Sequence, residues 1–151
     1  MLPEWIDYNG HVRDAYYGLI ASSACDALMD RIGVDAAYRQ RTQCTLYTLE
    51  MHVHYLSEVK RSDRVAVEVT VLGSDAKRLH AGFTLRRAPA GEVAATVEFM
   101  LLHVRQGDKP GSERFPPEVL AAIATLAGAA PAAAFGPGSR ALSLRGGARQ
   151  A

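Results

Sequence analysis

Cysteine is scarce in this chain of 151 residues, which has two in all, Cys25 and Cys44. Their separation matches no metal-binding motif, so the pair favours free thiols in a reducing cytoplasm over a disulfide framework or a zinc site. An excess of charge is lacking as well, because 17 Lys and Arg nearly balance 16 Asp and Glu, for a formal net charge of +1. A nucleic-acid-binding protein or a polybasic membrane-surface protein would carry a basic excess, so the balance argues against both classes.

Long hydrophobic runs are absent too. The opening residues 1–10 carry Glu4 and Asp7 and lack the basic start and apolar run of a secretion signal. The longest weakly charged stretch, residues 119–135, is mostly Ala and contains Pro131, which suits it poorly to span a bilayer. A composition of 48% hydrophobic and 22% charged residues is typical of a soluble globular domain. We therefore expect a cytoplasmic protein with neither a nucleic-acid nor a membrane partner.

The chain does contain one strong helical pattern, followed by strand patterns. Apolar residues spaced by three and four predict a helix over residues 14–32, which Gly33 ends. Several small residues in it allow another element to approach closely, so we expect this helix to be central. Alternation predicts strands over residues 45–56, 65–71, 79–86 and 93–104, with a further turn at 35–38 and hairpin connections at 73–77 and 89–91. One helix on one face of an antiparallel sheet is α+β architecture.

The strand predicted at residues 93–104 is apolar on both of its faces. Such a strand is usually covered on both sides. Because one helix cannot cover both, we expect a second subunit on the other side and hence at least a dimer.

Residues 107–151 differ in character from residues 1–106. The sequence Pro-Pro-Glu at 116–118 predicts the start of a short helix that runs to about residue 126. The Ala-, Gly- and Pro-rich residues 127–139 predict a linker before a loosely held end. We therefore expect one domain at residues 1–106 and a C-terminal extension at 107–151.

The most concentrated polar group, Asp7-Tyr8-Asn9-Gly10-His11, lies directly before the predicted central helix. A helix N-terminus offers unpaired backbone N–H groups and a partial positive charge, which can polarise a carbonyl or hold an oxyanion. A carboxylate in the preceding turn can act as a general base or a nucleophile against that carbonyl. Gly10 would let the backbone approach a ligand closely. A capped surface turn explains the same residues, so both interpretations stay open on this segment alone.

The spacing Asp7-x-x-Gly10-His11-Val12, followed by Tyr17, resembles the signature of 4-hydroxybenzoyl-CoA thioesterase-type hotdog proteins. In that α+β fold an antiparallel sheet wraps around one long central helix, which matches the predicted order of elements. The resemblance implies a catalytic acid at Asp7 and an oxyanion site at the start of the helix. It implies neither a metal nor a cofactor, since CoA would be part of the substrate.

Further blocks are similar to the betainyl-CoA thioesterases found beside or fused to L-carnitine dehydrogenases. The similar blocks are residues 5–11, 32–38, 47–52, 58–60, 71–73, 77–80 and 100–104, with a weaker similarity at 138–143. The similarity implies hydrolysis of a short-chain acyl-CoA, with betainyl-CoA as the expected substrate in carnitine catabolism. It also implies a homodimer or a dimer of dimers, and a functional association with L-carnitine dehydrogenase.

The resemblance assigns roles to particular residues. Asp7 would activate water or attack the thioester carbonyl itself, with Asn9 and His11 orienting substrate or water. The backbone N–H groups of residues 12–14 would stabilise the oxyanion. The residues expected to bind substrate are Trp5, Tyr8, Gly10, Val12, Tyr17, Tyr47, Glu50 and Tyr55.

Betaine carries a quaternary ammonium, which cannot donate hydrogen bonds and is best held by aromatic faces and a carboxylate. Glu50 and several aromatic residues lie on segments near the expected site. The aromatic residues are Trp5, Tyr8, Tyr47 and Tyr55. Core packing explains each ring as well, and a surface or interface position explains Glu50.

Alternation places His52 and His54 on one strand face, where they could chelate a metal with a third ligand such as His11 or Glu50. Orienting hydrogen bonds or interface packing explain the same pair. Three alternatives therefore stay open beside the expected enzyme: a thioesterase for another short or aromatic acyl group, a non-catalytic acyl-CoA-binding module, and a metal-dependent β-protein.

Overall fold

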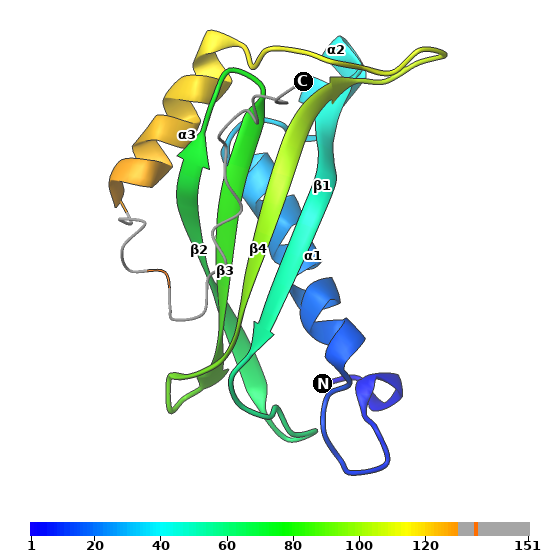
Figure 1. Ribbon diagram of the computed structural model, residues 1–151, viewed down its shortest axis with the longest axis vertical. Coiled ribbons are helices and arrows are strands. Elements are labelled where there is room, and N and C mark those ends of the chain that lie inside the picture. Colours follow the sequence, from blue (N-terminus) through cyan, green and yellow to red (C-terminus); the bar gives the residue numbers. More distant parts are fainter. Residues whose placement is uncertain (130–134, 136–151) are drawn as a thin grey trace, which may run out of the picture.

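The computed structural model describes residues 1–129 and 135, and its order of elements follows the predicted one (Figure 1). A short 3-10 helix, Pro3–Trp5, precedes the long helix α1. The remaining bounds are α1 Asp14–Arg31, α2 Ala36–Thr42, β1 Cys44–Tyr55, β2 Arg64–Ser74, β3 Arg78–Ala88, β4 Glu92–Arg105, β5 Gly111–Ser112 and α3 Pro117–Ala129. The predicted central helix and four strands are confirmed, with ends that shift by up to three residues.

The four long strands form one antiparallel sheet in the order β1-β4-β3-β2, and β5 pairs with the end of β4. Helix α1 crosses behind the sheet in Figure 1, while α3 lies beside β2. Two edges result among the described strands, β1 on one side and β2 on the other. This is the α+β arrangement that the periodicity predicted.

The core lies between α1 and the sheet, because alternate residues of the central strands turn toward the helix. On β3 these are Leu79, Ala81, Phe83 and Leu85, all fully buried. Ala21 of α1 is also fully buried, so its lack of bulk brings the helix backbone close to the strands. Each large apolar side chain buried here stabilises the fold by about 1.5–3 kcal/mol.

A bulge between Thr48 and Glu50 interrupts the alternation of β1. Before it, Leu46 turns to the core; after it, Met51 and Val53 turn to the same side, opposite Phe99 and Val97 of β4. Strict alternation would place all odd residues from 45 to 55 on one face, and the bulge rules this out. The extra residue reverses the alternation, so the side chain of Tyr47 points to the other face of the sheet.

On the face of the sheet turned away from α1, the middle of β4 is buried within one chain. On β4 its residues Glu98 and Met100 are 1% and 5% exposed. Phe135 lies on this face, because a Cβ added to Gly82 would meet its ring at 2.5 Å. The apolar character of β4 therefore does not by itself require a second subunit, and the dimer stays a prediction.

The C-terminal part contains a helix that shares the main core. Helix α3 runs over Pro117–Ala129, and its Val119 and Ile123 are buried in the same hydrophobic cluster as the sheet. The division of the chain at residue 106 stays a prediction. Most of the predicted linker, and the weaker similarity at residues 138–143, lie outside the described residues. Among the described helices, none has both the length and the apolar character needed to cross a membrane.

Candidate active site

The loop before α1 folds back on itself as a small hairpin. Ile6 bridges to Val12, the Asp7 N–H donates to the His11 carbonyl at 2.8 Å, and the Gly10 N–H donates to the Asp7 carbonyl at 3.1 Å. Gly10 has a φ of +83°, a conformation that residues with a Cβ rarely adopt. The glycine of the Asp-x-x-Gly motif is thus required by the turn, and the turn fixes Asp7 at the entrance to the helix.

The Asp7 carboxylate is oriented by its own loop. Its Oδ1 atom accepts hydrogen bonds from the Asn9 N–H at 2.8 Å and the His11 N–H at 3.0 Å. The bond from His11 lowers the pKa of Asp7 below its ordinary value, partial desolvation opposes this, and the bond from Asn9 lowers the pKa further. Both bonds occupy Oδ1, so Oδ2 is the atom available to take a proton. Asn9 and His11 therefore position this carboxylate through their backbones.

Three of the backbone N–H groups at the start of α1 already have partners. The Val12 N–H donates to the Val59 carbonyl at 2.8 Å and the Arg13 N–H to the Trp5 carbonyl at 2.9 Å. The Ala15 N–H donates to the Asp14 side chain at 2.9 Å. Of the groups expected at residues 12–14, the Asp14 N–H is the one without a hydrogen bond in the described part of the chain. Of the three expected donors, the Asp14 N–H is therefore the one available to a ligand.

A pocket of about 320 Å³ opens beside this helix start. Its wall consists of Val12, Asp14, Tyr17, Tyr55, Leu56, Ser57 and Glu58. The Tyr17 and Tyr55 rings meet edge to face, with centroids 5.2 Å apart. The Tyr17 hydroxyl accepts the Val59 N–H at 3.1 Å, and the Tyr55 hydroxyl donates to the Asp14 carbonyl at 3.1 Å. Desolvation raises the pKa of both tyrosines, so both hydroxyls are neutral near pH 7.

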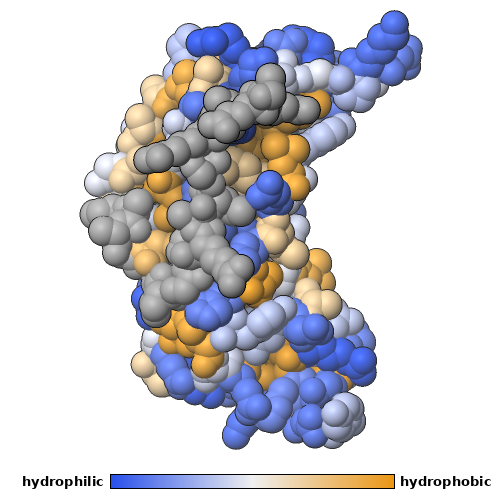
Figure 2. Space-filling view, in the orientation of Figure 1, coloured by the Kyte–Doolittle hydropathy of each residue, from blue (hydrophilic) through white to orange (hydrophobic). Residues whose placement is uncertain are grey.

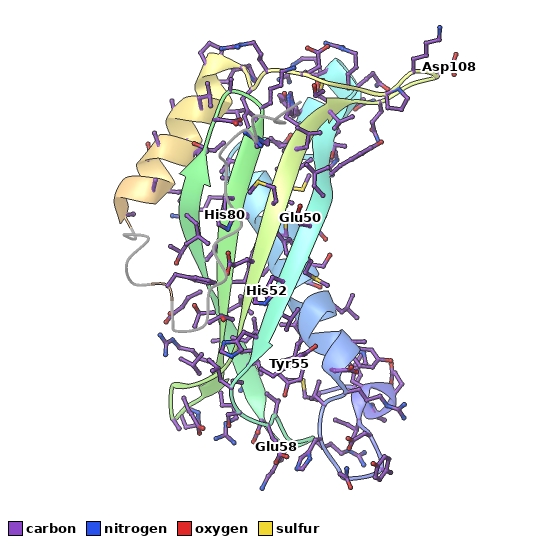
Figure 3. The ribbon with its side chains drawn as sticks, in the orientation of Figure 1. Glu50, His52, Tyr55, Glu58, His80 and Asp108 are labelled. Atoms are coloured by element: carbon purple, nitrogen blue, oxygen red, sulfur yellow. The ribbon has the colours of Figure 1, made fainter. Side chains whose placement is uncertain are left out.

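Glu58 joins this pocket to the Asp7 loop. Its Oε2 atom lies 3.2 Å from Nε2 of His11. Figure 3 shows Glu58 beyond the end of β1, below Tyr55 and near the N-terminal end of α1. Glu58, Leu56 and Ser57 were not among the residues expected at the site, and Asp14 was expected there only for its backbone N–H. In the sequence, the signal for Glu58 is the similar block at residues 58–60. This block follows β1, and because β1 runs toward the start of α1, the block meets the loop before that helix.

The structure brings together some of the expected substrate-binding residues and separates others. Val12, Tyr17 and Tyr55 line the pocket, and Gly10 lies in the adjoining loop. Tyr8 does not line it and is 96% exposed, while the Trp5 ring stacks on Tyr16 at 5.3 Å.

Tyr47 and Glu50 lie elsewhere on β1. At about 3.3 Å per residue they are roughly 26 and 17 Å along the strand from Tyr55. Glu50 pairs with Met100, and Figure 3 shows it at mid-strand, well above Tyr55. Both side chains also point to the face of the sheet turned away from α1. The structure therefore does not bring them to this pocket within one chain.

The metal alternative is not supported by the described residues. No group of three His, Cys, Asp or Glu side chains there is arranged to hold a metal ion. His52 instead has Nδ1 at 3.9 Å from Oε1 of Glu98, and His80 has Nε2 at 2.9 Å from Oε2 of the same carboxylate. Figure 3 shows both histidines on the sheet, away from the Asp7 loop.

Comparison with known proteins identifies the family. Residues 1–123 match the Thioesterase-like superfamily. The chain belongs to this superfamily. The betainyl-CoA thioesterase of Pseudomonas aeruginosa is 49% identical over 127 residues, which are 84% of this chain and 79% of that protein. The L-carnitine dehydrogenase/betainyl-CoA thioesterase of Agrobacterium fabrum is 44% identical over 66% of this chain, which spans 20% of that protein.

Solved structures agree with this membership. A Pseudomonas putida protein reported as a candidate thioesterase is 41% identical, with a TM-score of 0.79 over 98% of this chain and 93% of that one. A hypothetical Staphylococcus aureus protein, determined in complex with CoA, is 33% identical, with a TM-score of 0.81 over 87% and 82% of the two chains. The predicted hotdog fold is confirmed, and this member of the Thioesterase-like superfamily is a thioester hydrolase.

Proposed function

We propose that this thioesterase hydrolyses betainyl-CoA to betaine and CoA. One observation carries the proposal: an oriented Asp7 carboxylate lies in the loop directly before α1, and the start of α1, with the Asp14 N–H, borders a pocket whose wall contains two tyrosines and two carboxylates. Asp7 and the Asp14 N–H supply a base and an oxyanion donor, the groups that thioester hydrolysis needs. The tyrosine rings and carboxylates of the pocket suit a cationic acyl group. The 49% identity to the Pseudomonas aeruginosa betainyl-CoA thioesterase supports the same substrate.

In the proposed reaction Asp7 acts as a general base. Its Oδ2 atom takes a proton from water while the water oxygen bonds to the thioester carbon. The carbonyl oxygen becomes an oxyanion that accepts a hydrogen bond from the Asp14 N–H. When this intermediate collapses the C–S bond breaks, and the CoA thiolate leaves and is protonated. A positioned base contributes about 10²–10⁴-fold in rate, and one oxyanion donor about 10²–10³-fold.

Direct attack by Asp7 on the thioester carbon is the second route open to the same geometry. It would form an acyl-enzyme anhydride with loss of CoA thiolate, and water would then release betaine. Hydrolysis in ¹⁸O-labelled water under single turnover tests for direct attack. Label that enters the Asp7 carboxylate supports it, whereas label in betaine alone is given both by the general base and by an anhydride that water opens at its acyl carbon. Neither route uses a cofactor, since CoA belongs to the substrate.

We also propose that the enzyme is a homodimer, or a dimer of such dimers, assembled through β1. This strand is an edge among the described strands, and its Leu49 and Met51 are each 52% exposed. Leu19 of α1 is 46% exposed as well. Figure 2 shows hydrophobic atoms along the recessed right-hand edge, where β1 lies in Figure 1. An exposed edge strand with apolar side chains is a template for pairing with another chain.

The names of several relatives join a betainyl-CoA thioesterase to an L-carnitine dehydrogenase. A functional association with such a dehydrogenase in carnitine catabolism is therefore part of the proposal for this chain. Copurification of the two proteins, or a coupled assay with both present, tests it.

The experiment that tests the function compares betainyl-CoA with acetyl-CoA and a benzoyl-type CoA ester, using a thiol-detecting dye. Preference for betainyl-CoA supports the proposal. Preference for acetyl-CoA or the aromatic ester identifies a thioesterase for another acyl group. Binding of all the esters without release of CoA identifies a non-catalytic acyl-CoA-binding module and overturns the proposal.

A further inference from the structure

The charge of the pocket beside α1 is one-sided. Among the described residues, its wall contains Asp14 and Glu58 and no Lys, Arg or His. The remaining wall is apolar or aromatic, apart from Ser57. A permanent cation that cannot donate hydrogen bonds is stabilised by such a combination of aromatic rings and negative charge. A neutral or anionic acyl group would gain nothing from the two carboxylates.

The two carboxylates are not equivalent. Oδ1 of Asp14 accepts the Ala15 N–H at 2.9 Å and so serves the first turn of α1. Glu58 contributes only its Oε2 atom to the contact with His11, at 3.2 Å, and its side chain is 69% exposed. Within the described part of the chain, the other oxygen of Glu58 has no partner and can face a ligand, while Asp14 contributes its N–H to the reacting carbonyl.

The backbone next to Glu58 is held by two hydrogen bonds. The neighbouring Val59 donates its N–H to the Tyr17 hydroxyl at 3.1 Å and accepts the Val12 N–H at 2.8 Å. The imidazole of His11 holds the Glu58 side chain, and the His11 N–H holds Asp7. The Glu58 carboxylate is thus tied to the same loop that orients the base.

The length of the acyl group agrees with this placement. In a betainyl thioester a single methylene separates the carbonyl carbon from the ammonium nitrogen. If the carbonyl oxygen accepts the Asp14 N–H, the ammonium must lie directly next to Asp14. The pocket that Asp14 shares with Tyr17, Tyr55 and Glu58 is the adjoining space.

We propose that Glu58, together with the rings of Tyr17 and Tyr55, selects acyl groups that carry a trimethylammonium. The inference rests on the proposed betainyl-CoA hydrolysis and names the residues that set its specificity. Asp7 and the Asp14 N–H perform the chemistry on any acyl group that reaches them. Glu58 determines which acyl group is preferred.

The test uses betainyl-CoA and its neutral isostere, tert-butylacetyl-CoA, in which carbon replaces the ammonium nitrogen. The measured quantity is the ratio of kcat/KM for the two esters. In Glu58→Gln the ratio should fall about tenfold, which corresponds to about 1.4 kcal/mol of lost cation stabilisation. The rate with tert-butylacetyl-CoA should change less than twofold, which also shows that the variant is folded and competent. Tyr55→Leu should lower the ratio in the same direction.

Asp108→Asn is the matched control. It removes one carboxylate at the opposite end of the molecule, as Figure 3 shows, and should leave the ratio unchanged. Glu50→Gln tests the alternative, because Glu50 is the carboxylate expected from the sequence to meet the cation. If Glu50→Gln lowers the ratio and Glu58→Gln does not, Glu58 is not the specificity residue.

The proposed substrate and the proposed role of Glu58 are contradicted by different results. If the wild-type enzyme prefers betainyl-CoA and Glu58→Gln keeps the full preference, the specificity role of Glu58 is wrong and the proposed function stands. If the wild-type enzyme hydrolyses other esters and shows no preference for betainyl-CoA over its isostere, the proposed substrate is wrong and the role of Glu58 falls with it.

Discussion

Nε2 of His11 lies 3.2 Å from Oε2 of Glu58, so one histidine joins the loop before α1 to the loop after β1. The backbone N–H of the same histidine donates to Asp7 at 3.0 Å. The side chain of His11 therefore contacts Glu58, and its backbone contacts Asp7. Substitutions in this region separate these two effects.

Replacing Asp7 with Asn should reduce kcat by about 10²–10⁴-fold, because an amide cannot take the proton from water. The fold should persist, since the Asn side-chain oxygen can still accept the N–H groups of Asn9 and His11. The measurement is kcat with betainyl-CoA, with the thermal unfolding midpoint as a control. A variant that unfolds normally and keeps nearly the full rate shows that Asp7 is not the base.

The pH profile should show the lowered pKa of Asp7. A base with a depressed pKa is ionised above that pKa and loses activity only as the pH falls through it. For Asp7 the acid limb of kcat/KM should therefore lie below about pH 4, the ordinary range of a free aspartate. The neutral ester tert-butylacetyl-CoA is the substrate to use, because its binding does not depend on the charge of Glu58. An acid limb above pH 5 that disappears in Asp7→Asn contradicts this prediction.

The thiol of Cys25 should be inert in the native enzyme. Burial, with a smaller contribution from the charge of Asp26, raises its pKa to about 12, and the thiolate is the reactive form. Cys44 is 2% exposed. A thiol reagent at pH 8 should label neither cysteine until denaturant is added, when both should react. Rapid labelling of the native protein would falsify the buried placement.

His80 should contribute more to stability than His52, although both contact Glu98. His80 is 2.9 Å from this buried carboxylate, while His52 is 3.9 Å away and more exposed. His80→Ala should lower the free energy of unfolding by about 3 kcal/mol, because it removes the close partner of a buried charge. His52→Ala should cost less than about 1 kcal/mol. Chemical denaturation of the two variants measures both values, and equal losses would contradict the geometry.

Periodicity was enough to predict α1 and the strands, because their apolar residues recur at helical or alternating positions. For the segment around Gly10, which has a positive φ in the structure, the local residues fitted both a ligand site and a capped surface turn, so both interpretations stayed open. The residues that line the pocket could not be predicted to the same extent. Tyr47 and Tyr55 appeared equivalent on one alternating strand, until the bulge at residues 48–50 placed them on opposite faces. A bulge of this kind depends on pairing with β4, which no local pattern in β1 records.

Glu58 was missed for a related reason. It lies in a short loop with no periodicity, and its partner His11 is far away in the sequence. Only the antiparallel course of β1, which ends beside the start of α1, brings the two together. Tertiary proximity of this sort follows from topology and strand length, and these are known only once the sheet is assembled.

The hairpin at Asp7 is closed by main-chain amides, whereas Glu58 reaches the pocket through its side chain alone. The consequence concerns how this enzyme can change. Exchanging the residue at 58 leaves every contact that aims Asp7 in place, so new acyl preferences are open to single substitutions. The proposed hydrolytic groups, Asp7 and the Asp14 N–H, depend on backbone geometry and would keep their positions after such substitutions.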